Sequence, residues 1–248
     1  MTPTDVLDLF DSLVGPVTDA VAGVDDRAAG GQRPGQYALD LVADGEILGP
    51  LVDAGLGVLS EESGVIDNTG PFTVVVDPVD GSTNASLGLP WYALSLCAVD
   101  GDGAAAAMVA NLATGRRYRA VRKEGATRDG IVLPTPPTVP LSEAVIGVSG
   151  LPPASLGWAQ FRAYGAAALD LCAVAAGEMH GFVDCNADAH GVWDYAAAML
   201  ICREVGVDVV DARARDLLVL DHAVRRTPIA APGVLLDELV AARAAIVA

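Results

Sequence analysis

The sequence predicts an α+β or α/β protein in which helices are layered against β-sheets. Apolar runs suited to buried strands end in acidic or Gly-containing turns over residues 58–63, 73–84 and 91–110. After residue 140, strand-like and helix-like segments alternate, which argues against a helical bundle or a β-sandwich. With 248 residues, 52% of them hydrophobic, the chain can bury a large core.

Two helical segments precede the strands of the first half. Apolar side chains recur at helical spacing over residues 4–24, with an interruption expected at Gly15-Pro16. A loop over residues 26–36 leads to a second apolar segment, residues 37–51. Short strands end near Ser60 and Val76. The apolar runs 91–99 and 104–110, separated by two Asp-Gly pairs, predict a β-hairpin that continues into a strand over residues 117–121.

The Pro-rich stretch 131–140 predicts a boundary between an N-terminal α+β half, residues 1–140, and a C-terminal α/β half, residues 141–248. In the second half we expect strands near residues 144–148, 183, 207–210 and 229. Helices are expected over residues 166–176 and 193–205 and from residue 234 onward. The two halves are expected to form one compact unit with the functional site between them.

Charge and cysteine content narrow the function classes. The formal net charge of −17 disfavours nucleic acid and anionic membranes as partners. One basic cluster, Arg116 to Lys123, is interpreted as a solvated hairpin face rather than an anion site. The four cysteines are scattered, and three lie in apolar runs, which indicates core residues rather than bridges or ligands. Without a signal-like N-terminus or an apolar span, we expect a soluble cytoplasmic protein.

Two aspartates that follow a β-branched run suggest a site for a cation and a phosphate. Asp77 and Asp80 flank Pro78 at a strand end, and Gly81-Ser82 can open a helix. Two carboxylates about 4 Å apart repel by roughly 4 kcal/mol at an effective dielectric near 20. Such a pair needs protons or hard cations such as Mg²⁺, Ca²⁺ or Mn²⁺, and backbone N–H groups at the helix start suit a phosphate. In isolation, an ordinary turn is the more common explanation of Asp77, Asp80 and Gly81.

Three motifs in order carry more information than any one of them. Ser60-Glu61-Glu62-Ser63, the segment from Asp77 to Asn84, and Trp193-Asp194-Tyr195-Ala196-Ala197 resemble the signatures of the inositol monophosphatase family. Residues 165–168, Gly-Ala-Ala-Ala, are similar to a further family segment. The resemblance implies a layered αβαβα sandwich and a Mg²⁺-dependent, lithium-sensitive phosphatase of small sugar or polyol phosphates. It also implies a homodimer.

The resemblance assigns roles residue by residue. It implies two or three Mg²⁺ ions, with Mn²⁺ as a substitute, held by Glu61, Asp77, the Val79 carbonyl, Asp80 and Asp194. Ser82, paired with Asp44, would orient the attacking water, and Glu61 or that pair would accept its proton. The N–H groups of Gly81 and Ser82 would bind phosphate. The substrate side would be formed by Gly165, Ala166, Ala167 and either Asp184 or Asp188.

The substrate is less well determined than the reaction. The stretch 184–190 departs from the inositol-type pattern, and His190 is interpreted as an exposed loop residue. Arg33 is the candidate counterpart of a lysine on the family's mobile loop. Inositol 1-phosphate, fructose 1,6-bisphosphate, histidinol phosphate and 3′-phosphoadenosine phosphates stay open as substrates. A non-catalytic metal-binding regulatory scaffold is the alternative from a different class.

Overall fold

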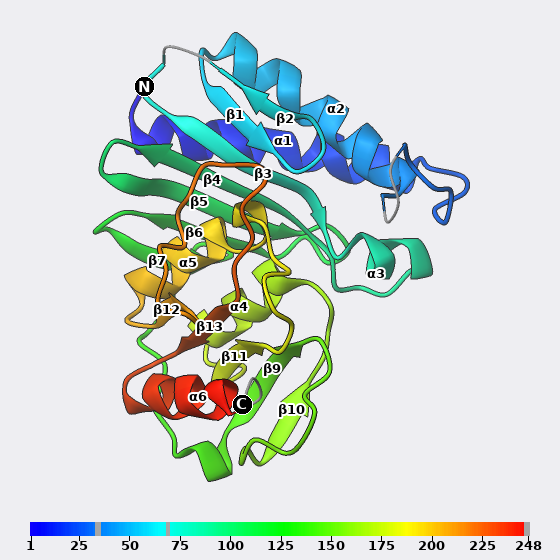
Figure 1. Ribbon diagram of the computed structural model, residues 1–248. Helices are drawn as coiled ribbons and strands as arrows, with labels where there is room; N and C mark the ends of the chain where they lie inside the picture. Colours follow the sequence, from blue (N-terminus) through cyan, green and yellow to red (C-terminus); the bar gives the residue numbers. More distant parts are fainter. Residues whose placement is uncertain (33–35, 68–69, 246–248) are drawn as a thin grey trace.

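The computed structural model describes residues 1–32, 36–67 and 70–245, and its elements form five layers (Figure 1). An eight-stranded sheet has the order β2-β1-β3-β4-β5-β6-β7-β8, and a five-stranded sheet has the order β10-β9-β11-β13-β12. The helices are α1 (Pro3–Ala22), α2 (Ala38–Asp53), α3 (Ser82–Leu87), α4 (Ala167–Ala175), α5 (Ala196–Glu204) and α6 (Val234–Ala244). Two 3-10 turns are η1 (Leu141–Glu143) and η2 (Val192–Asp194).

The first sheet is mostly antiparallel. β1 pairs parallel to β3, and the strands from β3 to β8 follow one another as an antiparallel meander. Its strands are β1 (Gly57–Ser60), β2 (Gly64–Ile66), β3 (Thr73–Asp80), β4 (Ala93–Asp100), β5 (Gly103–Asn111), β6 (Arg117–Val121), β7 (Gly125–Arg128) and β8 (Ile131–Val132). The predicted hairpin is confirmed as β4 and β5, because Asp100 pairs with Gly103 across the turn.

The second sheet begins after residue 140 and is mixed. β9 pairs parallel to both β10 and β11, whereas β13 runs antiparallel to β11 and β12. Its strands are β9 (Val145–Ser149), β10 (Gln160–Arg162), β11 (Gly181–Asp184), β12 (Asp208–Asp211) and β13 (Pro228–Ala231). The short strands β2 and β10 were not predicted, because three residues are too few to show an alternating pattern.

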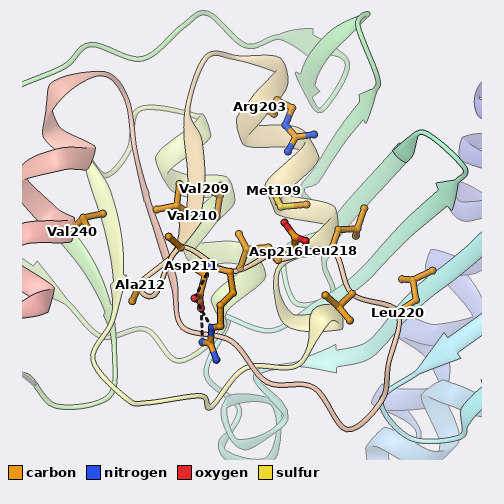
Figure 2. A pocket seen from close by; sticks show the side chains of 14 residues that line it. Met199, Arg203, Val209, Val210, Asp211, Ala212, Asp216, Leu218, Leu220 and Val240 are labelled. Atoms are coloured by element: carbon orange, nitrogen blue, oxygen red, sulfur yellow. Dashed lines mark hydrogen bonds and ion pairs between the residues drawn. The ribbon is translucent and has the colours of Figure 1, made fainter.

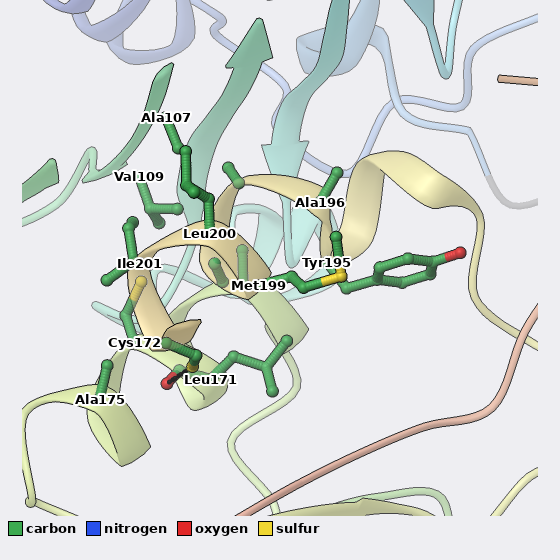
Figure 3. Close-up of a cluster of buried hydrophobic side chains, with 14 of the residues drawn as sticks. Ala107, Val109, Leu171, Cys172, Ala175, Tyr195, Ala196, Met199, Leu200 and Ile201 are labelled. Carbon is green, nitrogen blue, oxygen red and sulfur yellow. Dashed lines mark hydrogen bonds between the residues drawn. The ribbon is translucent and has the colours of Figure 1, made fainter. Parts of the chain in front are cut away.

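Three hydrophobic cores hold the five layers together, and this arrangement confirms the predicted αβαβα sandwich. The first lies between the α1–α2 layer and the outer face of the first sheet. The second fills the space between the sheets, where α4 and α5 pack, and Figure 3 shows Leu171, Cys172, Leu200 and Ile201 within it. The third joins the second sheet to α6. Because α4 and α5 lie between the sheets, their starting residues are held close to the ends of strands from both halves.

Two helix boundaries differ from the prediction. Helix α1 continues through Gly15-Pro16, which are exposed, because buried Leu13, Val14 and Val17 on either side hold its other face against the core. The hydrogen bond that Pro16 cannot donate is therefore lost on the solvent side. The helix expected over residues 193–205 is interrupted at Tyr195, with η2 before it and α5 after it.

The basic cluster of the β5–β7 region is ion-paired. Arg117 and Arg119 reach Asp11 of α1 at 3.1 and 2.9 Å, and Arg122 reaches Asp100 at 2.7 Å. The side chains of these arginines stay partly exposed. Arg117 and Arg119 therefore tie β6 to α1, and the partly exposed cluster is in keeping with its interpretation as a hairpin face.

Candidate metal centre

The two aspartates of the opening motif lie at the end of β3, and both are buried. The pairing of β3 with β4 shifts register between Asp77 and Asp80, so the strand bulges at Pro78-Val79. The Val79 N–H donates to Asp77 Oδ1 at 3.1 Å. The N–H groups of Ala167 and Ala168, at the start of α4, donate to the two oxygens of Asp80 at 3.2 and 2.7 Å. Each carboxylate is thus oriented by backbone donors.

Asp194 joins this pair from the other half of the chain. It lies in η2, and its Oδ2 accepts the Gly191 N–H at 2.7 Å. Oxygens of Asp77, Asp80 and Asp194 all lie within 4.8 Å of one another. The fold therefore brings together two of the three predicted motifs as one cluster of carboxylates.

The third motif, Glu61, faces the same cluster. The Glu61 N–H donates to the Val76 carbonyl at 3.1 Å, which ties the end of β1 to β3 just before Asp77. Burial raises the pKa of Glu61 to about 8, and the neighbouring charges of Asp194 and Glu62 add to this rise. Glu62 accepts a short hydrogen bond from Gln36 and thus turns toward the loop before α2.

These residues fit a divalent cation. Burial, reinforced by the charges of Glu61 and Asp80, raises the pKa of Asp77 well above its ordinary value, and burial with the Asp194 charge raises that of Asp80 to about 7. Among the described residues, the buried oxygens Asp77 Oδ2 and Asp40 Oδ1 receive no hydrogen bond. Buried anionic oxygens without donors are costly unless protonated or bound to a cation. Hard carboxylate ligands are the ones that Mg²⁺ and Mn²⁺ prefer.

The structure corrects the predicted partner of Ser82. The Asp44 carboxylate accepts the Ser60 hydroxyl at 2.6 Å and a short hydrogen bond from Ser63, so it holds the turn around Glu61 instead. Asp40, one helical turn earlier in α2, has Ser82 within hydrogen-bonding reach. Burial raises the pKa of Asp40 to about 7, against the lowering effect of the Tyr37 N–H and Ser82. Asp40 therefore replaces Asp44 beside the candidate water-orienting serine.

The glycines of the motifs allow the start of α3 to approach the start of α4. Gly81 has φ +84°, and a Cβ there would lie 2.9 Å from the Ala166 Cβ and 3.1 Å from the Gly165 carbonyl oxygen. The Asn84 side chain bridges the same interface by donating to the Trp91 and Tyr164 carbonyls at 2.7 and 2.6 Å. The fold thus places Gly81, Gly165 and Ala166 side by side. Ala167, expected to line the substrate side, donates its N–H to Asp80.

Residues of the stretch 184–190 bond to one another, and two of them are more buried than the sequence suggested. Asp184 is fully buried, and it accepts the Asn186 N–H at 2.9 Å and contacts His190 Nδ1 at 2.8 Å. The side chain of His190 is only 13% exposed, so its interpretation as an exposed loop residue was wrong. Burial lowers its pKa, but Asp184 and Asp194 outweigh this effect and raise the pKa to about 9.

Asp188, the other candidate for a sugar contact, is ion-paired. Arg213 and Arg215 reach its carboxylate at 2.9 and 2.6 Å, and Arg215 also binds Asp211. Both aspartates of this stretch thus have partners within the protein, and burial raises the pKa of Asp194 while the charge of His190 opposes this rise. Arg33 lies outside the described residues.

A groove of about 920 Å³ runs along α5, β12 and the segment 212–220 (Figure 2). Met199, Asp211 and Leu218 are among its lining residues, and the metal-site carboxylates are not. This groove is therefore separate from the candidate metal centre.

The layered fold and the clustered carboxylates form a candidate metal centre, and comparison with known proteins shows the family of this chain. The inositol monophosphatase family model matches residues 54–248. A fructose-1,6-bisphosphatase of Pyrococcus furiosus is 33% identical over 199 residues, 78% of this chain and 76% of that protein. A fructose-1,6-bisphosphatase/inositol-1-monophosphatase of Thermococcus kodakarensis is 34% identical over 201 residues, 78% of this chain and 76% of that protein.

A solved structure gives the same result. A hypothetical protein from Pyrococcus horikoshii, described as having similarities to inositol-1 monophosphatase, superposes with a TM-score of 0.83 at 25% identity and covers 96% of both chains. The chain belongs to the inositol monophosphatase family. As a member it is a metal-dependent phosphatase of the sugar- and polyol-phosphate superfamily. In the described part of the chain, no helix is long and apolar enough to cross a membrane.

Proposed function

We propose that the protein hydrolyses phosphate monoesters of small sugars or polyols with Mg²⁺ as its cofactor. The observation that carries the proposal is the clustering of Asp77, Asp80 and Asp194 oxygens within 4.8 Å in a buried setting. A divalent ion bound there supplies charge that neutralises phosphoryl oxygens and acidifies a water molecule. Because phosphoryl transfer passes through a loose transition state, positioning and charge neutralisation carry most of the catalysis.

The chain's own residues divide the work. Glu61, Asp77, Asp80 and Asp194, with the Val79 carbonyl, are proposed to hold two or three Mg²⁺ ions, for which Mn²⁺ can substitute. Asp40 and Ser82 are proposed to orient and deprotonate the attacking water, since an acid with a pKa of about 7 suits a general base near neutral pH. The N–H groups of Gly81 and Ser82 are proposed to hold the phosphate.

For the substrate, we propose fructose 1,6-bisphosphate and inositol 1-phosphate as the leading pair. The names of the Pyrococcus furiosus and Thermococcus kodakarensis relatives support this choice. Both substrates present a phosphate beside hydroxyl groups. His190 is held by Asp184, and its charge acts on the proposed ligand Asp194. Either hydroxyls or a second phosphate could be bound there by a cationic imidazole.

Assembly and location complete the proposal. We propose a homodimer, supported by Leu151 and Phe161, which are 85% and 49% exposed near the open edge strand β10. A cytoplasmic location is supported by the cysteines, which are all free. Light scattering of the purified protein tests the dimer, and a monomer at micromolar concentration would contradict it.

The function is tested by phosphate release from a panel of sugar, polyol and nucleotide phosphates. We expect release from the sugar or polyol phosphates with Mg²⁺, loss of release with EDTA, and inhibition by Li⁺. The Asp80→Asn variant should be inactive while keeping its fold by circular dichroism. If no member of the panel is hydrolysed in the presence of Mg²⁺, the regulatory-scaffold alternative is favoured instead.

A further inference from the structure

The segment 221–227, between β12 and β13, reaches from the second sheet to the metal centre. In Figure 1 the orange chain that leaves β12 rises past α5 to the level of β3 and returns to β13. None of its residues belongs to the three sequence motifs. Its contacts nevertheless touch the metal centre from both halves of the chain.

The first contact is with Glu61, in the N-terminal half. His222 Nε2 lies 2.9 Å from the Glu61 carbonyl oxygen. A carbonyl only accepts, so Nε2 carries the hydrogen and donates it. Since the Glu61 N–H already donates to Val76, the peptide groups on both sides of the Glu61 Cα are held. This leaves little freedom for the direction in which the Glu61 side chain leaves the backbone.

The second contact is with Trp193, the residue before Asp194 in the C-terminal half. The rings of His222 and Trp193 have centroids 4.8 Å apart at 34°, and the Arg225 guanidinium lies 4.8 Å from the Trp193 ring centroid. Arg225 also donates to the His222 carbonyl at 2.8 Å, and the side chains of both residues contact Trp193. Trp193 is buried, and its position determines where the η2 turn presents Asp194.

The third contact continues toward the 184–190 stretch. Arg226 and His190 exchange backbone hydrogen bonds of 2.8 and 3.2 Å, and Thr227 accepts the Asp188 N–H at 2.9 Å through its hydroxyl. One short segment is thereby bonded to the peptide of Glu61, stacked on the neighbour of Asp194, and paired with His190. Glu61 lies more than 100 residues away from both Trp193 and His190 in the sequence.

We propose that His222 is a positioning residue that sets the separation of Glu61 and Asp194, and so the affinity of the centre for its cation. The inference rests on the proposed function, because it assumes that both carboxylates are ligands. Groups that orient metal ligands without touching the metal typically change metal affinity by 10- to 100-fold when they are removed. Loss of the His222 hydrogen bond should therefore weaken cation binding more than it weakens substrate binding.

The test measures Mn²⁺ affinity of the full-length protein by electron paramagnetic resonance titration, without substrate. His222→Phe keeps a ring against Trp193 but removes the donor, and we expect about 10-fold weaker Mn²⁺ binding. His222→Gln keeps a donor and should recover most of this loss. The matched control is His180→Phe, because His180 also bonds a backbone group, the Val145 N–H, at 2.9 Å, but contacts none of the proposed ligands.

Several outcomes would overturn the inference. Wild-type Mn²⁺ affinity in His222→Phe does so, and so does a raised KM with unchanged Mn²⁺ affinity, which would make His222 a substrate contact. If His222→Phe does not fold, Arg225→Lys decides, since it keeps the positive charge that acts on Asp194 but loses the planar guanidinium against Trp193 and should weaken Mn²⁺ binding; wild-type affinity there contradicts the coupling. A wild-type protein that binds no Mn²⁺ would instead refute the proposed function, and with it this inference.

Discussion

Replacing Asp77 with asparagine should stabilise the metal-free protein and remove its response to Mg²⁺. The change keeps the shape of the side chain and an oxygen that can accept the Val79 N–H, so the backbone turn is retained. It removes one negative charge from a buried cluster whose oxygens lie within 4.8 Å of one another. The substitution should therefore raise the stability of the metal-free protein and remove the stabilisation that Mg²⁺ gives the wild type.

The size of the effect follows from the geometry. Two unit charges 4.8 Å apart repel by roughly 3 kcal/mol at an effective dielectric near 20. Protonation already relieves part of this repulsion, because the pKa of Asp77 is raised by burial and by its acidic neighbours. We therefore expect Asp77→Asn to gain about 2 kcal/mol at pH 8, which is roughly 4–8 °C in Tm for a chain of this length.

Thermal unfolding of the EDTA-treated proteins at pH 8, followed by addition of 10 mM Mg²⁺, measures both effects. The wild type should start lower and rise with Mg²⁺, whereas Asp77→Asn should start higher and stay unchanged. An exposed variant, Asp53→Asn, serves as the charge control and should respond to Mg²⁺ like the wild type. The reasoning is refuted if metal-free Asp77→Asn is less stable than the wild type and still gains stability from Mg²⁺.

Three further outcomes are expected. Because the folded pKa values of Asp40 and Asp80, about 7, exceed the ordinary value of 3.8, metal-free stability should fall as pH rises from about 4 to 8, and a flat Tm over this window would contradict the shifts. Gly81→Ala combines φ +84° with a 2.9 Å approach to Ala166 and should lower Tm by at least 4 °C, so an unchanged Tm would rule out the close contact. Asp40→Asn should lower kcat at least 100-fold with little change in Tm, whereas Asp44→Asn should mainly lower Tm; the reverse order in paired assays would restore Asp44 to the water-orienting role.

The sequence predicts the layered fold and the carboxylate centre well because both depend on local patterns. The run before Asp77 is apolar and β-branched, so it forms a buried strand, and Gly81-Ser82 after it favour a sharp turn into a helix. The motif around Asp194 is similarly local. Residues whose roles depend on packing between distant segments are harder to predict from the sequence.

Asp40 and Asp44 show why. They lie four residues apart on one buried face of α2, so spacing alone does not separate them, and only the packing of α2 against α3 brings Ser82 to Asp40. His222 gives no sequence signal because its partner, the Glu61 carbonyl, is a backbone group 161 residues away. His190 was expected to be exposed because it lies in a loop, yet its ring contacts buried Asp184 and is itself mostly buried.

The central claim is that Asp77, Asp80 and Asp194, together with Glu61, form a divalent-cation centre. The most direct test is the anomalous scattering of Mn²⁺ in crystals of the protein grown without substrate. We expect at least one anomalous peak within coordination distance of the Asp77 and Asp80 carboxylates. Ordered crystals soaked in Mn²⁺ that show no peak there, or show peaks only at surface acids, would contradict the account.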